Sequence, residues 1–398
     1  MSGRGPRRRD DRLWQAGFLL GSALGAAITV AGRRAERAAR SGLVDWPKVA
    51  SIAEARLRQA PGALTADELR ATEPAYAAAM ARVVPALSAH LGAPLPGVVE
   101  RVAVVDRAAW VEANVATFAG LIGKLEGELL DQLLPPGGGF GAAAMALANR
   151  WVTTRQLGLL LGFMGQKVLG QYDVALLSAE ATPGRLLFVE ENIRQTARAL
   201  DVPLDPFRTW IALHETTHAF EFEAHPWLRP YLAERLERQL TLLSRDARGM
   251  GREALRGLGQ ALRGEGRGDD LHWLERLMGD EQRRLFRETQ AVMALLEGFG
   301  DHVMDEVGRG LVPGVARISQ RFHERRARRT PFERAMLLIT GMDLKLEQYQ
   351  KGEQFVDAIH RAGGAEALRR LWSGPETLPS SDEIASPQRW LDRMGVRA

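Results

Sequence analysis

Apolar side chains recur every three or four positions through most of this chain, which is the period of one helix face. The longest such segments span residues 44–132 and 142–170, and prolines and glycines at 135–139 separate them. Within the first segment, residues 98–134 are expected to form two helices. The pattern predicts a protein built mainly from α-helices.

Two short segments in the middle of the chain show strand character instead. Residues 172–177 and 185–189 are brief apolar runs separated by a loop with a Pro-Gly pair, which is typical of a hairpin. A short helix is expected at 192–200, and Asp205 followed by Pro206 has the N-cap and N1 residues of a further helix. The expected fold class is mainly α with some β (α+β), with a small hairpin or sheet before the helix that begins at Asp205.

That helix carries the sequence His214-Glu215-Thr216-Thr217-His218. Helical residues four apart lie on the same face, so the two imidazoles can reach one metal ion at about 2 Å. Glu215 stands beside them as a candidate general base. The alternative is a pair of surface histidines on an amphipathic helix.

A catalytic zinc usually has three protein ligands and an open position for water, so a third ligand is needed. His225 stands seven residues after His218, where the extended zincin pattern wants six, and Glu221 takes the place of that pattern's glycine. Glu221 shares the histidine face, but its separation from His214 corresponds to about 10 Å of helix rise, too far for one ion. Neither residue is a good third ligand.

A better candidate is Glu297, in a downstream segment of helical period. Glu297 and Asp301 are four residues apart, the pattern in which the glutamate binds the metal and the aspartate hydrogen-bonds a ligand histidine. Gly298 and Gly300 each cost a helix about 1 kcal/mol relative to alanine, which indicates that something approaches closely here. The alternative is an ordinary solvated pair of carboxylates.

The composition supports a metal held by histidines and carboxylates. The 398 residues include no cysteine, which excludes cysteine zinc sites, disulfides and thiol nucleophiles. Two imidazoles and one carboxylate suit Zn²⁺, although the set admits other divalent ions. The formal charge is only +4, so we expect no nucleic-acid partner. The lack of cysteine fits a reducing compartment, and we expect a cytoplasmic protein.

The N-terminal region raises the question of a membrane. Residues 13–32 carry no charge, are long enough to span a bilayer, and have arginines on both sides. Membrane association through 13–32 and packing on the soluble domain or on another chain are both open, and the oligomeric state is undecided. We expect a tail at 1–43, a helical part at 44–150, and a metal-binding catalytic part at 151–398.

Five segments carry a resemblance to a known family: GQYDVALL (170–177), LLFVEENI (186–193), WIALHETTHAFEFEAHPWLRPYL (210–232), LLEGFGDHVMDEVG (295–308) and MDLKLEQYQKGEQFV (342–356). Together they resemble the zincin-like metallopeptidase type 2 family, some members of which are labelled as associated with biosynthesis of the deazaflavin coenzyme. The resemblance covers about residues 44–394 and implies a mostly helical zincin-like fold with metallopeptidase activity. His214, Glu215 and His218 match the family's HExxH, and Glu297 matches its downstream acidic helix.

The predicted function is zinc-dependent hydrolysis of peptide bonds in an unidentified peptide or protein substrate, with a metal-activated water and Glu215 as general base. The tetrahedral oxyanion needs a further donor, and Tyr172, His302 and Tyr349 are candidates that the sequence does not rank. The alternative is a non-catalytic, zinc-binding helical accessory protein linked to a cofactor biosynthesis pathway. Glu215 argues against it, because a purely structural site has no use for a general base.

Overall fold

The computed structural model describes residues 37–133, 139–173, 184–239, 241–242, 278–327 and 344–396. The uncharged segment at 13–32 and the proline-glycine loop at 135–138 lie outside the described residues.

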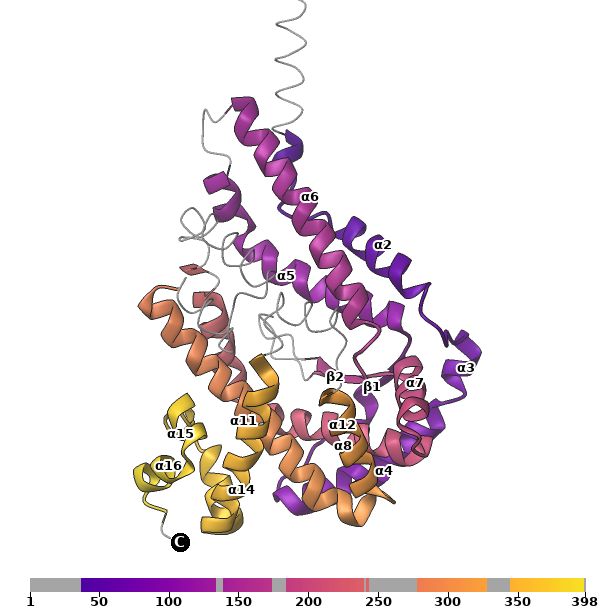
Figure 1. Ribbon diagram of the computed structural model, residues 1–398, viewed down its shortest axis with the longest axis vertical. Helices are drawn as coiled ribbons and strands as arrows, with labels where there is room; N and C mark the ends of the chain where they lie inside the picture. Colours follow the sequence, from indigo (N-terminus) through magenta and orange to yellow (C-terminus); the bar gives the residue numbers. More distant parts are fainter. Residues whose placement is uncertain are drawn as a thin grey trace, which may run out of the picture. The chain divides into compact units, whose positions relative to one another are not determined.

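The described part of the chain is mainly helical, as predicted, with one small sheet (Figure 1). Its helices are α2 (Trp46–Leu57), α3 (Ala66–Arg70), α4 (Glu73–Leu91), α5 (Arg107–Leu133), α6 (Gly139–Met164), α7 (Glu190–Leu200), α8 (Leu204–Glu223), α11 (Asp280–Leu311), α12 (Val315–Ala327), α14 (Leu344–Leu371), α15 (Ser381–Ala385) and α16 (Pro387–Met394). Its strands are β1 (Val102–Val105), β2 (Gly170–Asp173) and β3 (Arg185–Val189).

The chain divides into two compact units, each made from two separate stretches. Unit 1 comprises residues 1–52 and 118–159, and unit 2 comprises residues 53–117 and 160–398. The histidine motif and the downstream acidic helix both belong to unit 2. The predicted division at residues 43 and 150 stays a prediction.

The sheet of unit 2 has the strand order β1-β3-β2. β2 pairs antiparallel with β3, as the hairpin prediction required, and Tyr172 lies opposite Leu186. Residues 174–177 of the predicted strand lie outside the described residues. Leu186 to Val189 are all at most 1% exposed, because the central strand β3 is covered on both faces. β2 stands at one end of the strand order, so it is an edge strand of the described sheet, and it lies against α8.

The first strand, β1, corrects the prediction of two helices across residues 98–134. Val102 to Val105 pair in parallel with Leu186 to Val189. The sequence VAVV follows the short 3₁₀ turn Val99–Arg101, and three of its four residues are β-branched, which favours a strand. Periodicity cannot separate so short an apolar run from a buried helical turn.

α8 begins two residues earlier than predicted, at Leu204, with Pro203 as the N-cap. Asp205 does not cap the helix, and its carboxylate instead accepts a hydrogen bond from Arg208 Nη1 at 2.7 Å. α8 runs through the centre of unit 2, in contact with α4, α7, α11 and the sheet. It is buried along most of its length for that reason.

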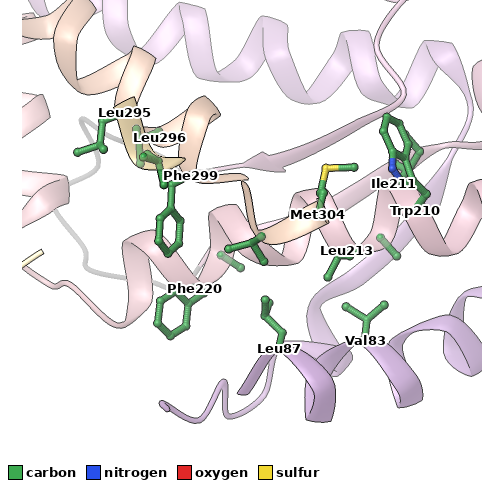
Figure 2. Close-up of a cluster of buried hydrophobic side chains, with 14 of the residues drawn as sticks. Val83, Leu87, Trp210, Ile211, Leu213, Phe220, Leu295, Leu296, Phe299 and Met304 are labelled. Atoms are coloured by element: carbon green, nitrogen blue, oxygen red, sulfur yellow. The ribbon is translucent and has the colours of Figure 1, made fainter. Parts of the chain in front are cut away.

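The core of unit 2 fills the space between α4, α8 and α11. Figure 2 shows Val83 and Leu87 of α4, Leu213 of α8 and Met304 of α11 gathered in this core. α11 lies along α14 (Figure 1), and the C-terminal segment packs back on the same unit. Trp390 is fully buried there, and its indole N–H donates to the carbonyl of Thr377.

Unit 1 has a small core of alanines, in which Ala39 lies against Ala143 and Ala146 of α6. The backbone N–H of Asp45 donates to the hydroxyl of Thr154 on α6 at 2.9 Å. A search of the described helices finds none with the length and apolar character that crossing a membrane requires.

Candidate metal centre

Two imidazoles converge on the same side of α8. His214 and His218 are one helical turn apart, and their Nε2 atoms lie 3.3 Å from each other. Both side chains are mostly buried, at 18% and 15% exposed. The local cause is the i and i+4 spacing within an unbroken helix.

α11 brings a carboxylate to these imidazoles from 80 residues downstream. Glu297 Oε2 lies 4.0 Å from His214 Nε2, and one ligand atom from each of the three residues lies within 4.8 Å of the other two. Tetrahedral ligands bound to zinc at 2.0–2.1 Å are about 3.3 Å apart. The donor set and its spacing therefore fit a zinc ion after small side-chain adjustments.

The Nδ1 atoms of both histidines have partners that fix the tautomer. Nδ1 of His214 lies 3.0 Å from Met304 Sδ, and Nδ1 of His218 lies 2.7 Å from Glu221 Oε2. With the proton on Nδ1, each ring presents the Nε2 lone pair to the same space. A cation placed between the two Nε2 atoms, which lie 3.3 Å apart, would be bound by both rings.

Glu221 is therefore a partner of a ligand rather than a ligand. It is fully buried, and burial raises its pKa to about 7 although His218 opposes the shift. A carboxylate bonded to a ligand imidazole orients the ring and raises its basicity. The sequence offered one signal for this role, the i and i+3 spacing from His218.

Glu215 lies against the edge strand β2. The backbone N–H of Tyr172 donates to Glu215 Oε2 at 3.1 Å. A methyl group at Gly170 would lie 2.6 Å from Glu215 Cγ and 2.8 Å from its Oε1, so only glycine lets the strand come this close. Burial raises the pKa of Glu215 to about 7, with Glu297 adding to the rise and His218 opposing it.

Of the two glycines beside Glu297, Gly298 lies at a close approach, as expected, whereas Gly300 has room for a methyl group. A side chain at Gly298 would overlap the backbone of Gly352 and Glu353 on α14. A side chain at Gly300 would be 3.5 Å from the His214 ring and 3.6 Å from His218, so the imidazoles pack over this glycine. Gly298 therefore lets α11 pack closely against α14.

Comparisons with known proteins agree with this arrangement. A model of the zincin-like metallopeptidase family matches residues 44–391. The chain belongs to that family. The family implies a metal, usually zinc, and places the protein in the metallopeptidase class of hydrolases.

A solved structure supports the same class. It comes from Chloroflexus aurantiacus and is described as a "putative hydrolase with a novel fold". That chain is 35% identical, with a TM-score of 0.64, and the match covers 89% of this chain and all of the other. No curated protein matches the chain.

The candidate oxyanion donors lie in different places. The hydroxyl of Tyr172 donates to Glu223 Oε1 at 2.8 Å, and burial together with Glu223 raises the pKa of Tyr172 to about 12. His302 is buried against α14, with Nδ1 2.7 Å from Asp357 Oδ1. Tyr349 lies on α14, and its side chain is outside the described residues. Among these candidates Tyr172 bonds to Glu215, through its main-chain N–H.

Two further residues, His225 and Asp301, lie near the ligand group in the sequence. His225 lies outside the ligand group, with Nδ1 2.8 Å from the carbonyl of Glu221 and its ring stacked on Trp372. Asp301 lies one turn after Glu297 and helps to raise the pKa of the half-buried Glu353. Its predicted bond to a ligand histidine stays a prediction, while Glu221 supplies the carboxylate at His218.

Proposed function

We propose that the protein is a zinc-dependent peptidase, with His214, His218 and Glu297 as metal ligands and Glu215 as general base. The observation that carries the proposal is the convergence of two imidazole Nε2 atoms and one carboxylate from two helices. Within the described residues this group has three members, which matches a catalytic site rather than a closed four-ligand structural site.

The residues around the ligands are suited to hydrolysis. Zinc in such a site supplies an acidified water molecule and a Lewis acid for the substrate carbonyl. Glu215 has a pKa of about 7, so near neutral pH it can accept a proton and return it to a leaving amine. The hydrogen bond from Tyr172 holds the carboxylate in one position while it does so.

The edge strand supports a peptide as the substrate. An extended peptide can pair with an exposed strand edge through its main chain. β2 is an edge strand of the described sheet and also contacts α8 and Glu215. A peptide held along β2 would pass beside the general base.

The test separates metal binding from chemistry. Glu215→Gln should retain stoichiometric zinc and lose hydrolysis of a quenched-fluorescence peptide library by at least ~100-fold, the usual contribution of a general base. Glu297→Ala should lose both zinc and activity, because a third ligand is gone. The exposed carboxylate of Glu112 on α5 provides a control, and Glu112→Gln should change neither.

Two outcomes would count against the proposal. Full zinc retention in Glu297→Ala would remove this residue from the ligand set. Wild-type protein that holds zinc but cleaves no peptide or unfolded protein would favour the non-catalytic accessory role.

A further inference from the structure

A second pair of imidazoles lies between α11 and α14 in unit 2. The ring centroids of His302 and His360 are 4.8 Å apart, and the ring planes are inclined at 78°. The rings of His214 and His218 in the candidate metal centre are 4.6 Å apart and are also inclined at 78°. The second pair therefore has almost the same separation and tilt as the first.

His302 has the surroundings of a metal ligand. Its side chain is 4% exposed, and its Nδ1 lies 2.7 Å from Asp357 Oδ1. A ligand histidine usually donates its other N–H to a carboxylate in this way, which directs the Nε2 lone pair to the metal. The Nε2 atom of His302 is buried and has no hydrogen-bond partner among the described residues. Buried polar atoms without a partner are rare, so this atom needs a bound group.

Three helices contribute to the surroundings of this pair. Asp357 and His360 are three residues apart on α14, and His302 comes from α11. His90, at the C-terminal end of α4, brings a third imidazole nearby: partial burial and the charges of His302 and His360 lower its pKa, while Glu306 raises it. Three of the eight histidines of the chain therefore lie in this region.

The pair is separate from the candidate metal centre. His302 follows Glu297 by five residues, which is a rotation of about 140° around α11. Among the described residues, the group of three ligand atoms within 4.8 Å of one another is His214, His218 and Glu297. The second pair offers two ligands as it stands, so we expect it to bind a metal more weakly than the first group, with water completing the coordination.

We propose that His302 and His360 bind a second divalent metal ion and that Asp357 orients His302 for it. Imidazole ligands suit Zn²⁺, Cu²⁺ and Ni²⁺, whereas Mg²⁺ and Ca²⁺ require oxygen ligands. The ion connects α11 with α14 and has no part in the proposed hydrolysis. The proposal therefore stands or falls independently of the peptidase function.

The main experiment is calorimetric titration of the metal-free, full-length protein with Zn²⁺. The wild type should bind two equivalents, the first tightly and the second more weakly. His302→Gln/His360→Gln should lose the weaker phase and keep the tight one, and His214→Gln/His218→Gln should do the reverse. His323→Gln is the matched control, because His323 is exposed on α12, and it should keep both phases.

Asp357→Asn tests the orientation of His302. The amide keeps an acceptor for Nδ1 but removes the charge, so the Kd of the second ion should rise by roughly tenfold, and that of the first should not change. Glu366→Gln is the control on the same helix. The Glu366 carboxylate is exposed and pairs with Arg369, so its loss should change neither Kd.

Nuclear magnetic resonance of the wild type covers the case in which the double variant folds poorly. One equivalent of zinc fills the tighter site. The second equivalent should shift the ring nitrogen signals of His302 and His360 and leave those of His225, which lies against Trp372, unchanged.

Three results would overturn the proposal. A wild-type protein that binds a single equivalent would leave a water molecule as the partner of His302 Nε2. A weaker phase that persists in the double variant would place the second ion elsewhere. Ring nitrogen shifts confined to other histidines at the second equivalent would do the same.

Discussion

Glu215 is placed by a neighbour that has no side chain. Replacement of Gly170 by alanine would put a methyl group 2.6 Å from Glu215 Cγ, so either the carboxylate or the strand must move. We expect Gly170→Ala to lower kcat/KM by about 100-fold, because small misplacements of a catalytic group have effects of that size. Zinc content should stay at the wild-type level, since the three ligands do not contact this methyl group.

Gly310→Ala provides the control for this variant. Gly310 is in the last turn of α11, and an added methyl group there meets nothing within 4 Å. Wild-type activity in Gly170→Ala would contradict the placement of Glu215 against β2. Parallel loss of zinc and activity would show a wider disturbance of the site.

Glu221 permits a test at the metal ligand itself. Glu221→Gln keeps a hydrogen-bond acceptor for His218 Nδ1 but removes the charge, so the imidazole becomes less basic. We expect the zinc Kd to rise by roughly tenfold, the lower end of the usual effect of such partners. Competition with a chromogenic chelator measures it.

Glu223 on the same helix is the matched comparison for Glu221. Its carboxylate accepts hydrogen bonds from Tyr172 and Arg101 rather than from a ligand histidine. Glu223→Gln should leave the zinc Kd unchanged. Equal changes of the zinc Kd in the two variants would contradict the assigned role of Glu221.

Some of these site residues could be predicted from the sequence and others could not, for a physical reason. His214, Glu215 and His218 follow from the geometry of a single helix, so their spacing was enough. The partner of His214 Nδ1 is Met304, which is 90 residues away, and local spacing says nothing about that contact. The role of Gly170 was not predicted for the same reason, since it depends on the packing of β2 against α8.

At the scale of elements, the backbones of α11 and α14 approach each other closely where they cross. A side chain at Gly298 would overlap the backbone at Gly352, and one at Gly352 would overlap the carbonyl of Ala294. We expect Gly298→Ala to lower the free energy of unfolding by about 1–3 kcal/mol, the usual cost of overpacking. Zinc affinity should also fall, because Glu297 precedes this glycine.

Urea denaturation with and without zinc measures both effects. Gly310→Ala again serves as control, and there the change should be neutral or stabilising by up to about 1 kcal/mol, because alanine favours a helix. A Gly298→Ala protein as stable as the wild type would show that the two helices can separate without cost.

The elements themselves were predictable where they were long or capped by sequence signals. Both ends of α7 and the start of α8 were predicted to within two residues, and the pairing of β2 with β3 was predicted from the loop between them. β1 was missed because its four residues have no partner nearby in sequence. Only the parallel pairing with β3, more than 80 residues later, makes them a strand.

At the scale of the whole molecule, the division into two units predicts which helices metal binding protects from hydrogen exchange. The ligands come from α8 and α11, so zinc stabilises the folded state of unit 2, by about 2.7 kcal/mol at a concentration 100 times Kd. We expect hydrogen exchange to slow on addition of zinc in residues 204–223 and 280–311. Residues 139–159 of α6 carry no ligand and belong to unit 1, so their exchange should not change.

Glu297→Ala is the control for the exchange measurement, and it should remove the protection in both helices of unit 2. Added protection in α8 alone would mean that α11 takes no part in binding, because a ligand contributed by α11 must restrain that helix as well. Equal added protection in α6 would show that the units open together, and then the division by contacts would not correspond to a division in stability. Protection confined to α8 and α11 is the result that a metal held between two distant helices of one unit requires.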